Sequence, residues 1–176
     1  MIDVRVRSGL RGLKEFKELP KRVQLAMLNA QRYAIAELKK TAIRETVRKY
    51  YLTRGQITHA MRSTPSGFIV SSKRLSLEQY KLSPRSPGRK YLLRGAVKKD
   101  SGMKMLGHNA FLFKVSQGYK PVKRLTRRRY PLKVITGPSI AQAVGNDETG
   151  ELLEAKAEEL FTTALNEKLA KMGWVK

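Results

Sequence analysis

Residues 21–49 contain neither glycine nor proline, and this stretch constrains the fold more than any other part of the sequence. Ala, Leu, Lys, Arg, Gln and Glu dominate it, and these residues favour helix. Pro20 precedes the stretch, as is typical of the first turn of a helix. We therefore expect one helix from Pro20 to about Lys49. At 1.5 Å per residue it would be about 45 Å long, whereas a domain of this size has a radius of gyration near 16 Å.

Apolar residues recur along this stretch at helical spacing and predict the buried stripe of the helix. They are Val23, Met27, Ala30, Ala34, Leu38 and Ala42, with Leu28, Ile35 and Ile43 beside them. Because so long a helix crosses the whole subunit, we expect part of its apolar face to be covered by a neighbouring copy.

Shorter elements surround the long helix. Alternation of Ile2, Val4 and Val6 with polar residues predicts a strand that ends at Gly9 and Gly12. Thr53 is a candidate N-cap for a second, short helix that ends before Pro65. Between residues 63 and 136, short apolar runs separated by Gly, Pro, Ser and Asp predict four or five antiparallel strands. In one of them we expect Phe111, Phe113 and Val115 to face the core.

The last segment predicts two more helices. Pro138 would occupy the first turn of a short helix that stops at Gly145, and a longer helix would run from about Thr149 to Met172 and end at Gly173. The predicted class is α+β, with the N-terminal and C-terminal helices packed on one antiparallel sheet. At 176 residues we expect one domain, organised as segments 1–62, 63–136 and 137–176.

Charge is distributed unevenly over these segments, although the whole chain carries a formal net charge of +23. Residues 63–136 hold 18 Lys/Arg and 2 Asp/Glu, whereas residues 137–176 hold 4 and 7. The densest cationic run predicts a contact with a partner or with DNA through Lys123, Arg124, Arg127, Arg128, Arg129 and Lys133. The complementary acidic patch, which would contact these cations between subunits, is Asp147, Glu148, Glu151 and Glu154.

Groups suited to catalysis or to cofactor binding are sparse in the sequence. Cysteine is absent, and His59 and His108 lack the spacing of a metal site or a catalytic triad. Glu78 and Asp100, the two acids of the middle segment, are far apart in sequence. We therefore expect a protein that is not an enzyme and has no cofactor. No window approaches the roughly 18 apolar residues of a membrane span, so we expect no membrane partner.

Two classes of function remain compatible with the charge. Cations alternate with aromatic residues in "RKYLLR", "GYKPVKR" and "RRRYPLK", a pattern that favours a non-catalytic nucleic-acid-binding β surface, with Arg on phosphates and Tyr on bases. No RNP pair, GXXG loop or zinc ligand set accompanies it. The other class is a structural assembly protein, in which oppositely charged patches join subunits.

Two stretches taken together carry a resemblance to a known family. They are "AIRETVRKYYLTRGQITHAMR", residues 42–62, and "NAFLFKVSQGYKPVKRLTRRRYPLKVITGPSIAQAV", residues 109–144. Three features occur in a fixed order. The first is a helix followed by Tyr and a short Ile-containing helix. The second is an "AF" strand with a Gly turn, and the third is an Arg-aromatic-Pro step that leads to "GPS". In this order and spacing the chain resembles the prophage minor tail protein Z family of long-tailed phages.

The resemblance implies a structural virion protein that completes the tail at the end that joins the head. It implies an oligomeric ring, partners among tail and head-tail connector proteins, a location in the virion tail and in the host cytoplasm during assembly, and no catalysis. The stretch "IAQAVGN" after "GPS" is small and polar, so a hydrophobic anchor there would be weaker than the family pattern implies.

Overall fold

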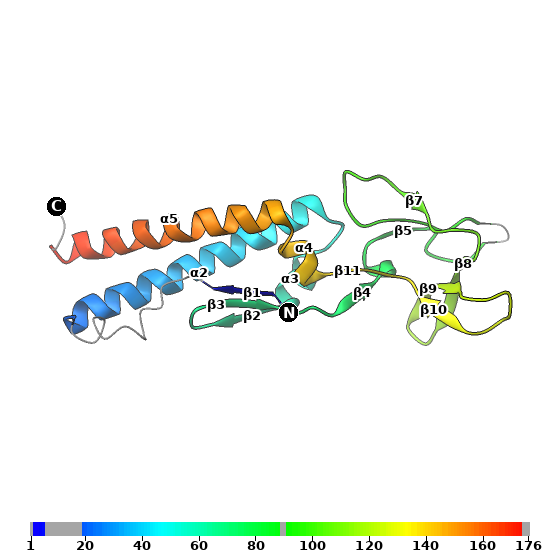
Figure 1. Ribbon diagram of the computed structural model, residues 1–176, viewed down its shortest axis with the longest axis horizontal. Coiled ribbons are helices and arrows are strands. Elements are labelled where there is room, and N and C mark those ends of the chain that lie inside the picture. The colour runs from blue at the N-terminus through cyan, green and yellow to red at the C-terminus, as the bar shows by residue number, and fades with distance from the viewer. Residues whose placement is uncertain (1, 6–18, 89–90, 174–176) are drawn as a thin grey trace.

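The computed structural model describes residues 2–5, 19–88 and 91–173 and has an α+β fold. The molecule is elongated, with a helical end and a β end (Figure 1). The helices are α2 (Lys21–Lys49), α3 (Arg54–Ala60), α4 (Ile140–Val144), α5 (Asp147–Lys171) and the 3-10 turn η1 (Leu77–Gln79). The strands are β1 (Ile2–Arg5), β2 (Met61–Thr64), β3 (Gly67–Val70), β4 (Arg74–Ser76), β5 (Lys81–Ser83), β6 (Arg94–Ala96), β7 (Lys104–Met105), β8 (Ala110–Val115), β9 (Gly118–Arg124), β10 (Leu132–Val134) and β11 (Thr136–Ser139).

The helical end is an antiparallel pair of helices, α2 and α5, which pack along each other although they are far apart in sequence (Figure 1). The buried ridge of α2 follows i, i+4 spacing and consists of Ala26, Ala30, Ala34, Leu38, Ala42 and Thr46. Most of these side chains are small, so α2 and α5 can approach each other closely. The Thr46 hydroxyl is satisfied within the helix, because Oγ1 donates to the carbonyl of Ala42 at 2.7 Å. The predicted long helix is therefore confirmed, and so is most of its core stripe, except that Met27 and Leu28 are half-buried and Ala26 is buried instead.

A three-stranded antiparallel sheet in the order β1–β3–β2 lies against α2. Its central strand β3 buries Phe68 and Val70 completely, while Ile69, which points to the other face, is half-buried. This period of two is the alternation expected of a strand with one buried face. The predicted first strand is confirmed for Ile2–Arg5, whereas Val6, Gly9 and Gly12 lie outside the described residues.

The other strands form three small antiparallel sheets beyond the ends of the helices, in the orders β11–β4, β5–β6–β7 and β10–β9–β8 (Figure 1). The sequence predicted that the helices cover one sheet of four or five strands, and this was wrong: residues 63–136 contain all the strands from β3 to β10, divided among separate small sheets. The helices pack on each other and on the first sheet. One hydrophobic cluster nevertheless extends from Leu38 and Phe68 at the helical end to Leu93 and Leu112 at the β end.

Local capping signals were read correctly in one place and incorrectly in two. Thr53 caps α3 in a reciprocal capping box with Gln56, as expected. Pro20 is the N-cap residue of α2, one position before the predicted first turn. Pro138 lies in strand β11, and α4 begins only at Ile140. The reason is a second capping box, in which Ser139 fixes the helix start.

Tyr80 contacts the "GPS" segment, residues 137–139, between the helical end and the β end of the molecule. The Tyr80 hydroxyl donates to the carbonyl oxygen of Pro138 at 2.7 Å, and the ring lies against Gly137. A Cβ atom on Gly137 would stand 2.6 Å from a ring carbon of Tyr80. Burial, with a contribution from Tyr50, raises the pKa of Tyr80 to about 12, so this hydroxyl stays protonated and keeps donating at neutral pH.

Replacing Gly137 with alanine is expected to destabilise the fold by about 1–3 kcal/mol, since the Tyr80 ring must move to admit the methyl group. For a chain of this length that corresponds to a fall in melting temperature of roughly 2–12 °C, measurable by circular dichroism. Gly150→Ala is the matched control, because a Cβ there meets nothing within 4 Å and the residue lies in α5. It should leave the melting temperature unchanged or raise it. Equal effects of both variants would contradict this role of Gly137.

Candidate functional site

The β end carries an uninterrupted cationic surface on β9, β10 and the loop between them. Residues 104–134 contain nine Lys/Arg and no Asp/Glu. All six cations predicted from the sequence are exposed, and the chain brings them together in this one hairpin: Lys123, Arg124, Arg127, Arg128, Arg129 and Lys133. Within the described residues, none of them forms an ion pair. The charge of this surface is therefore available to a partner.

Aromatic rings and a shallow hollow accompany these cations. The Arg124 guanidinium lies 5.0 Å from the centre of the Phe111 ring, and that of Arg129 lies 5.8 Å from the Tyr130 ring. Stacking of this kind orients a guanidinium without neutralising it. The hollow, of about 610 Å³, is lined by His108, Asn109, Arg124, Leu125, Thr126 and Arg127. The arrangement can hold an anionic group against apolar surface.

The outer face of the β10–β9–β8 sheet is apolar, and here the predicted orientation of β8 was wrong. Ala110 and Leu112 belong to the hydrophobic core, whereas Phe113 is 41% exposed and Phe111 is half-buried. Cross-strand register places Phe111, Val122 and Val134 side by side on this outer face, and Phe113 opposite Lys120. Apolar residues occur on both faces of β8, so alternation alone does not decide which face is buried.

A narrow acidic face runs along α5, opposite its buried residues. Asp147, Glu151, Glu154 and Glu158 follow one another at i, i+4, i+7 and i+11, and all are exposed. The buried residues of the helix, Thr149, Leu153 and Ala164, lie on the other side. Within the part of the chain that the structure describes, these four carboxylates form no ion pair. Eleven residues of helix make this acidic face about 17 Å long.

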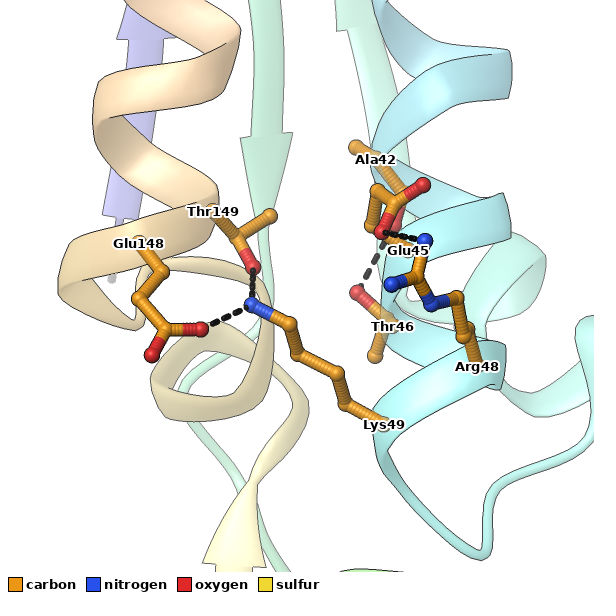
Figure 2. A network of polar contacts seen from close by, with 7 residues as sticks. All are labelled: Ala42, Glu45, Thr46, Arg48, Lys49, Glu148 and Thr149. Carbon is orange, nitrogen blue, oxygen red and sulfur yellow. Dashed lines mark hydrogen bonds and ion pairs between the residues drawn. The ribbon is translucent and has the colours of Figure 1, made fainter.

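Glu148, the fourth acid predicted for this patch, has a different environment (Figure 2). Its carboxylate accepts a hydrogen bond from Nζ of Lys49 at 2.6 Å, and the same ammonium lies 3.4 Å from Oγ1 of Thr149. The hydrogen bond from Lys49 and its charge lower the pKa of Glu148 below its ordinary value. Glu148 thus links the end of α2 to the start of α5, although its side chain remains 78% exposed.

The two charged surfaces lie apart on one molecule. The α5 helix starts near the middle of the molecule and runs away from the β10–β9–β8 sheet (Figure 1). Within one subunit the acidic face of α5 therefore does not lie against the cations of the β9–β10 hairpin. Among the described residues, neither surface is neutralised by the other, so each is open to an oppositely charged group of another molecule.

Sequence reasoning missed three features of these surfaces. Glu158 extends the acidic face by one turn and could have been found from its helical spacing to Glu154. Leu125, which is 55% exposed, adds apolar surface to the cationic loop. The third feature is which face of the β10–β9–β8 sheet is exposed. It could not be found from the sequence, because it depends on how the sheet packs.

The histidines and the other side chains that could bind a metal ion do not cluster among the described residues. His59 and His108 are both exposed and lie on different elements. Among the described residues, no group of three or more His, Asp or Glu side chains is arranged to hold a metal ion. None of the described helices combines the length and hydropathy needed to traverse a bilayer.

Comparisons with known proteins returned nothing: no protein-family model, no curated protein and no solved structure matches this chain.

Proposed function

We propose that this chain is a structural assembly protein, which joins copies of itself head to tail and completes the head-proximal end of a long phage tail. The observation that supports self-assembly most directly is the pair of unneutralised, oppositely charged surfaces at separate places on an elongated subunit. A head-to-tail interface requires two different, complementary patches on every copy, and repeated rotation closes them into a ring.

The placement in a phage tail depends on the resemblance of residues 42–62 and 109–144 to the minor tail protein Z family. Several features of the fold fit a structural role for those segments. The first forms the end of α2 with α3, and the second forms β8 to β11 with α4. Helix α2 packs against α4, and Tyr80, which lies between the two segments in sequence, bonds to Pro138 of the second. In this proposal the partners are further copies of the chain and neighbouring tail or connector proteins, and the protein resides in the virion tail after assembly in the host cytoplasm.

A second function, binding of nucleic acid, is favoured by one specific arrangement. Arg124 over Phe111 and Arg129 over Tyr130, beside the hollow with His108, offer guanidinium groups for phosphates and ring faces for bases. Electrostatic binding of this kind releases counterions, so its affinity falls by orders of magnitude between about 50 and about 200 mM salt.

Light scattering coupled to size exclusion, on nuclease-treated protein at about 50 and about 200 mM salt, distinguishes the two functions. Assembly predicts a particle of several times 20.0 kDa at the lower salt concentration, held by protein contacts alone because nucleic acid has been removed. A parallel gel-shift assay with random duplex DNA should then show little binding at the higher salt. A 20.0 kDa monomer that binds DNA tightly, with a steep salt dependence, would instead establish the nucleic-acid function and refute assembly.

A further inference from the structure

The β10–β9–β8 sheet has apolar residues on both faces, and on the outer face Val122 of the central strand is buried while its neighbours are at least partly exposed. Leu112 and Pro121, which are paired across the strands, face inward and are buried. On the outer face, Phe113 and Val134 are each 41% exposed. An antiparallel sheet that faces water normally alternates apolar and polar residues, and apolar residues on both faces are typical of a sheet that is covered twice. The outer face is thus suited to a second packing partner.

The free edge of β8 is less suited to a partner than this face. The backbone N–H of Leu112 points away from β9 and donates to the hydroxyl of Tyr91 at 3.0 Å. The N–H of Ala110 donates to the carbonyl of Gly107 at 3.2 Å. An incoming strand would have to displace these bonds. A partner that packs on the face leaves them intact.

The charge of the outer face specifies the chemistry of its partner. Lys120 lies opposite Phe113 on this face, and Arg124 lies opposite Leu132 with its guanidinium over Phe111. The loop cations Arg127, Arg128 and Arg129 follow directly. The partner must therefore combine carboxylates with apolar side chains on one surface.

The α5 helix has such a surface. Its acidic face, Asp147 to Glu158, continues at the same helical spacing into Phe161 and Leu165, which are half-buried. The acidic face is about 17 Å long, and the six residues of β8 span roughly 20 Å. A helix lying across an antiparallel sheet is a stable way to cover an apolar sheet face. In the same subunit α5 runs away from this sheet (Figure 1), so only the α5 of another copy can reach it.

We propose that α5 of a second copy covers the outer face of the β10–β9–β8 sheet, with its carboxylates against Lys120, Arg124 and the loop arginines. The inference depends on the proposed head-to-tail assembly and specifies its interface. Phe113 and Val134 are the apolar contacts at the centre of this interface, and the ion pairs lie around them.

Disulfide trapping tests the contact directly, because the chain has no cysteine of its own. Val134→Cys protein is mixed, under oxidising conditions, with Glu151→Cys, Glu154→Cys or Glu158→Cys protein. Disulfides require Cα atoms within about 7 Å, so at least one pair should yield a cross-linked heterodimer. Lys156→Cys is the matched control, since Lys156 is exposed on α5 but lies off the acidic face. It should give no cross-link with Val134→Cys.

A second variant tests the centre of the proposed interface. Phe113→Glu should raise the apparent dissociation constant of the assembly at least about tenfold, because it places a carboxylate opposite the acidic face of α5. Leu25→Glu is the control: Leu25 is 59% exposed on α2, outside the proposed interface. It should assemble normally, and circular dichroism should show that both variants are folded.

The outcomes separate this interface from the proposed function. Particles that form normally with Phe113→Glu, or that show no cross-link between Val134→Cys and the three α5 variants, would refute the interface and leave assembly standing. A protein that stays monomeric under all conditions would refute both. Loss of DNA binding by a monomeric Phe113→Glu variant would assign the face to nucleic acid instead.

Discussion

Reversing the charges of Arg127, Arg128 and Arg129 to glutamate should weaken self-assembly by at least about 100-fold. All three guanidinium groups are exposed and free of ion pairs within the described residues, so the substitution removes little from the folded monomer. In the assembly it would place three new carboxylates against the four of the acidic face of α5. Like charges brought together at an interface cost several kcal/mol, and each 1.4 kcal/mol is a factor of ten in the dissociation constant.

A control of equal charge separates this contact from the effect of net charge. Lys21, Arg22 and Arg32 are exposed on the first half of α2, away from the β end, and their reversal to glutamate changes the net charge by the same amount. That triple variant should assemble normally. Analytical ultracentrifugation over a concentration series measures both variants.

Rescue by a second reversal is the most specific form of this test. Glu151→Lys, Glu154→Lys and Glu158→Lys convert the acidic face of α5 into a basic one, and on their own they should also block assembly. Mixed with the arginine-reversed protein, they should restore association between the two variants. Failure of the mixture to associate, while each variant remains folded, would show that these two surfaces do not meet.

The helices could be predicted from sequence because their signals are local. Helix propensity over residues 21–49 and the Thr53 capping residue act within a few positions, and both predictions are confirmed. Pro138 was misplaced since proline fits the start of a helix and the edge of a strand equally well. Only the pairing of β11 with β4, residues far apart in the chain, decides between them.

The cationic surface, the acidic face and the outer sheet face differ in how much of each could be predicted from the sequence. The cations of residues 123–133 were found because a charge run in a loop remains exposed. The acidic face required helical spacing as well, and by that criterion Glu158 belongs to it and Glu148 does not. The outward orientation of Phe113 could not be deduced, because Leu112 is an equally suitable core residue. Which of the two faces inward depends on the packing of Leu112 and Pro121 against the rest of the core.

Replacing Phe68 with alanine is expected to have the largest effect on stability. Phe68 is completely buried on the central strand of the first sheet, in the same hydrophobic cluster as Leu38 of α2. Removing a buried phenylalanine side chain costs about 3–5 kcal/mol, a large part of the roughly 5–15 kcal/mol by which domains are stable. The melting temperature should fall by about 6–20 °C. Ile69→Ala, on the half-buried face of the same strand, is the control and should cost on the order of 1 kcal/mol.

The same variant tests whether the two ends of the molecule fold as one unit. Because one cluster connects Phe68 with Leu93 and Leu112, the loss at the helical end should destabilise the β end equally. Far-ultraviolet circular dichroism follows α2 and α5, while tryptophan fluorescence in a Trp174→Phe, Tyr119→Trp background follows β9 at the β end. In a single cooperative domain the two transitions coincide and shift together. Separate transitions, with only the helical signal shifted by Phe68→Ala, would show two independent units, and the sheet that carries the cations would then be stable without the helices.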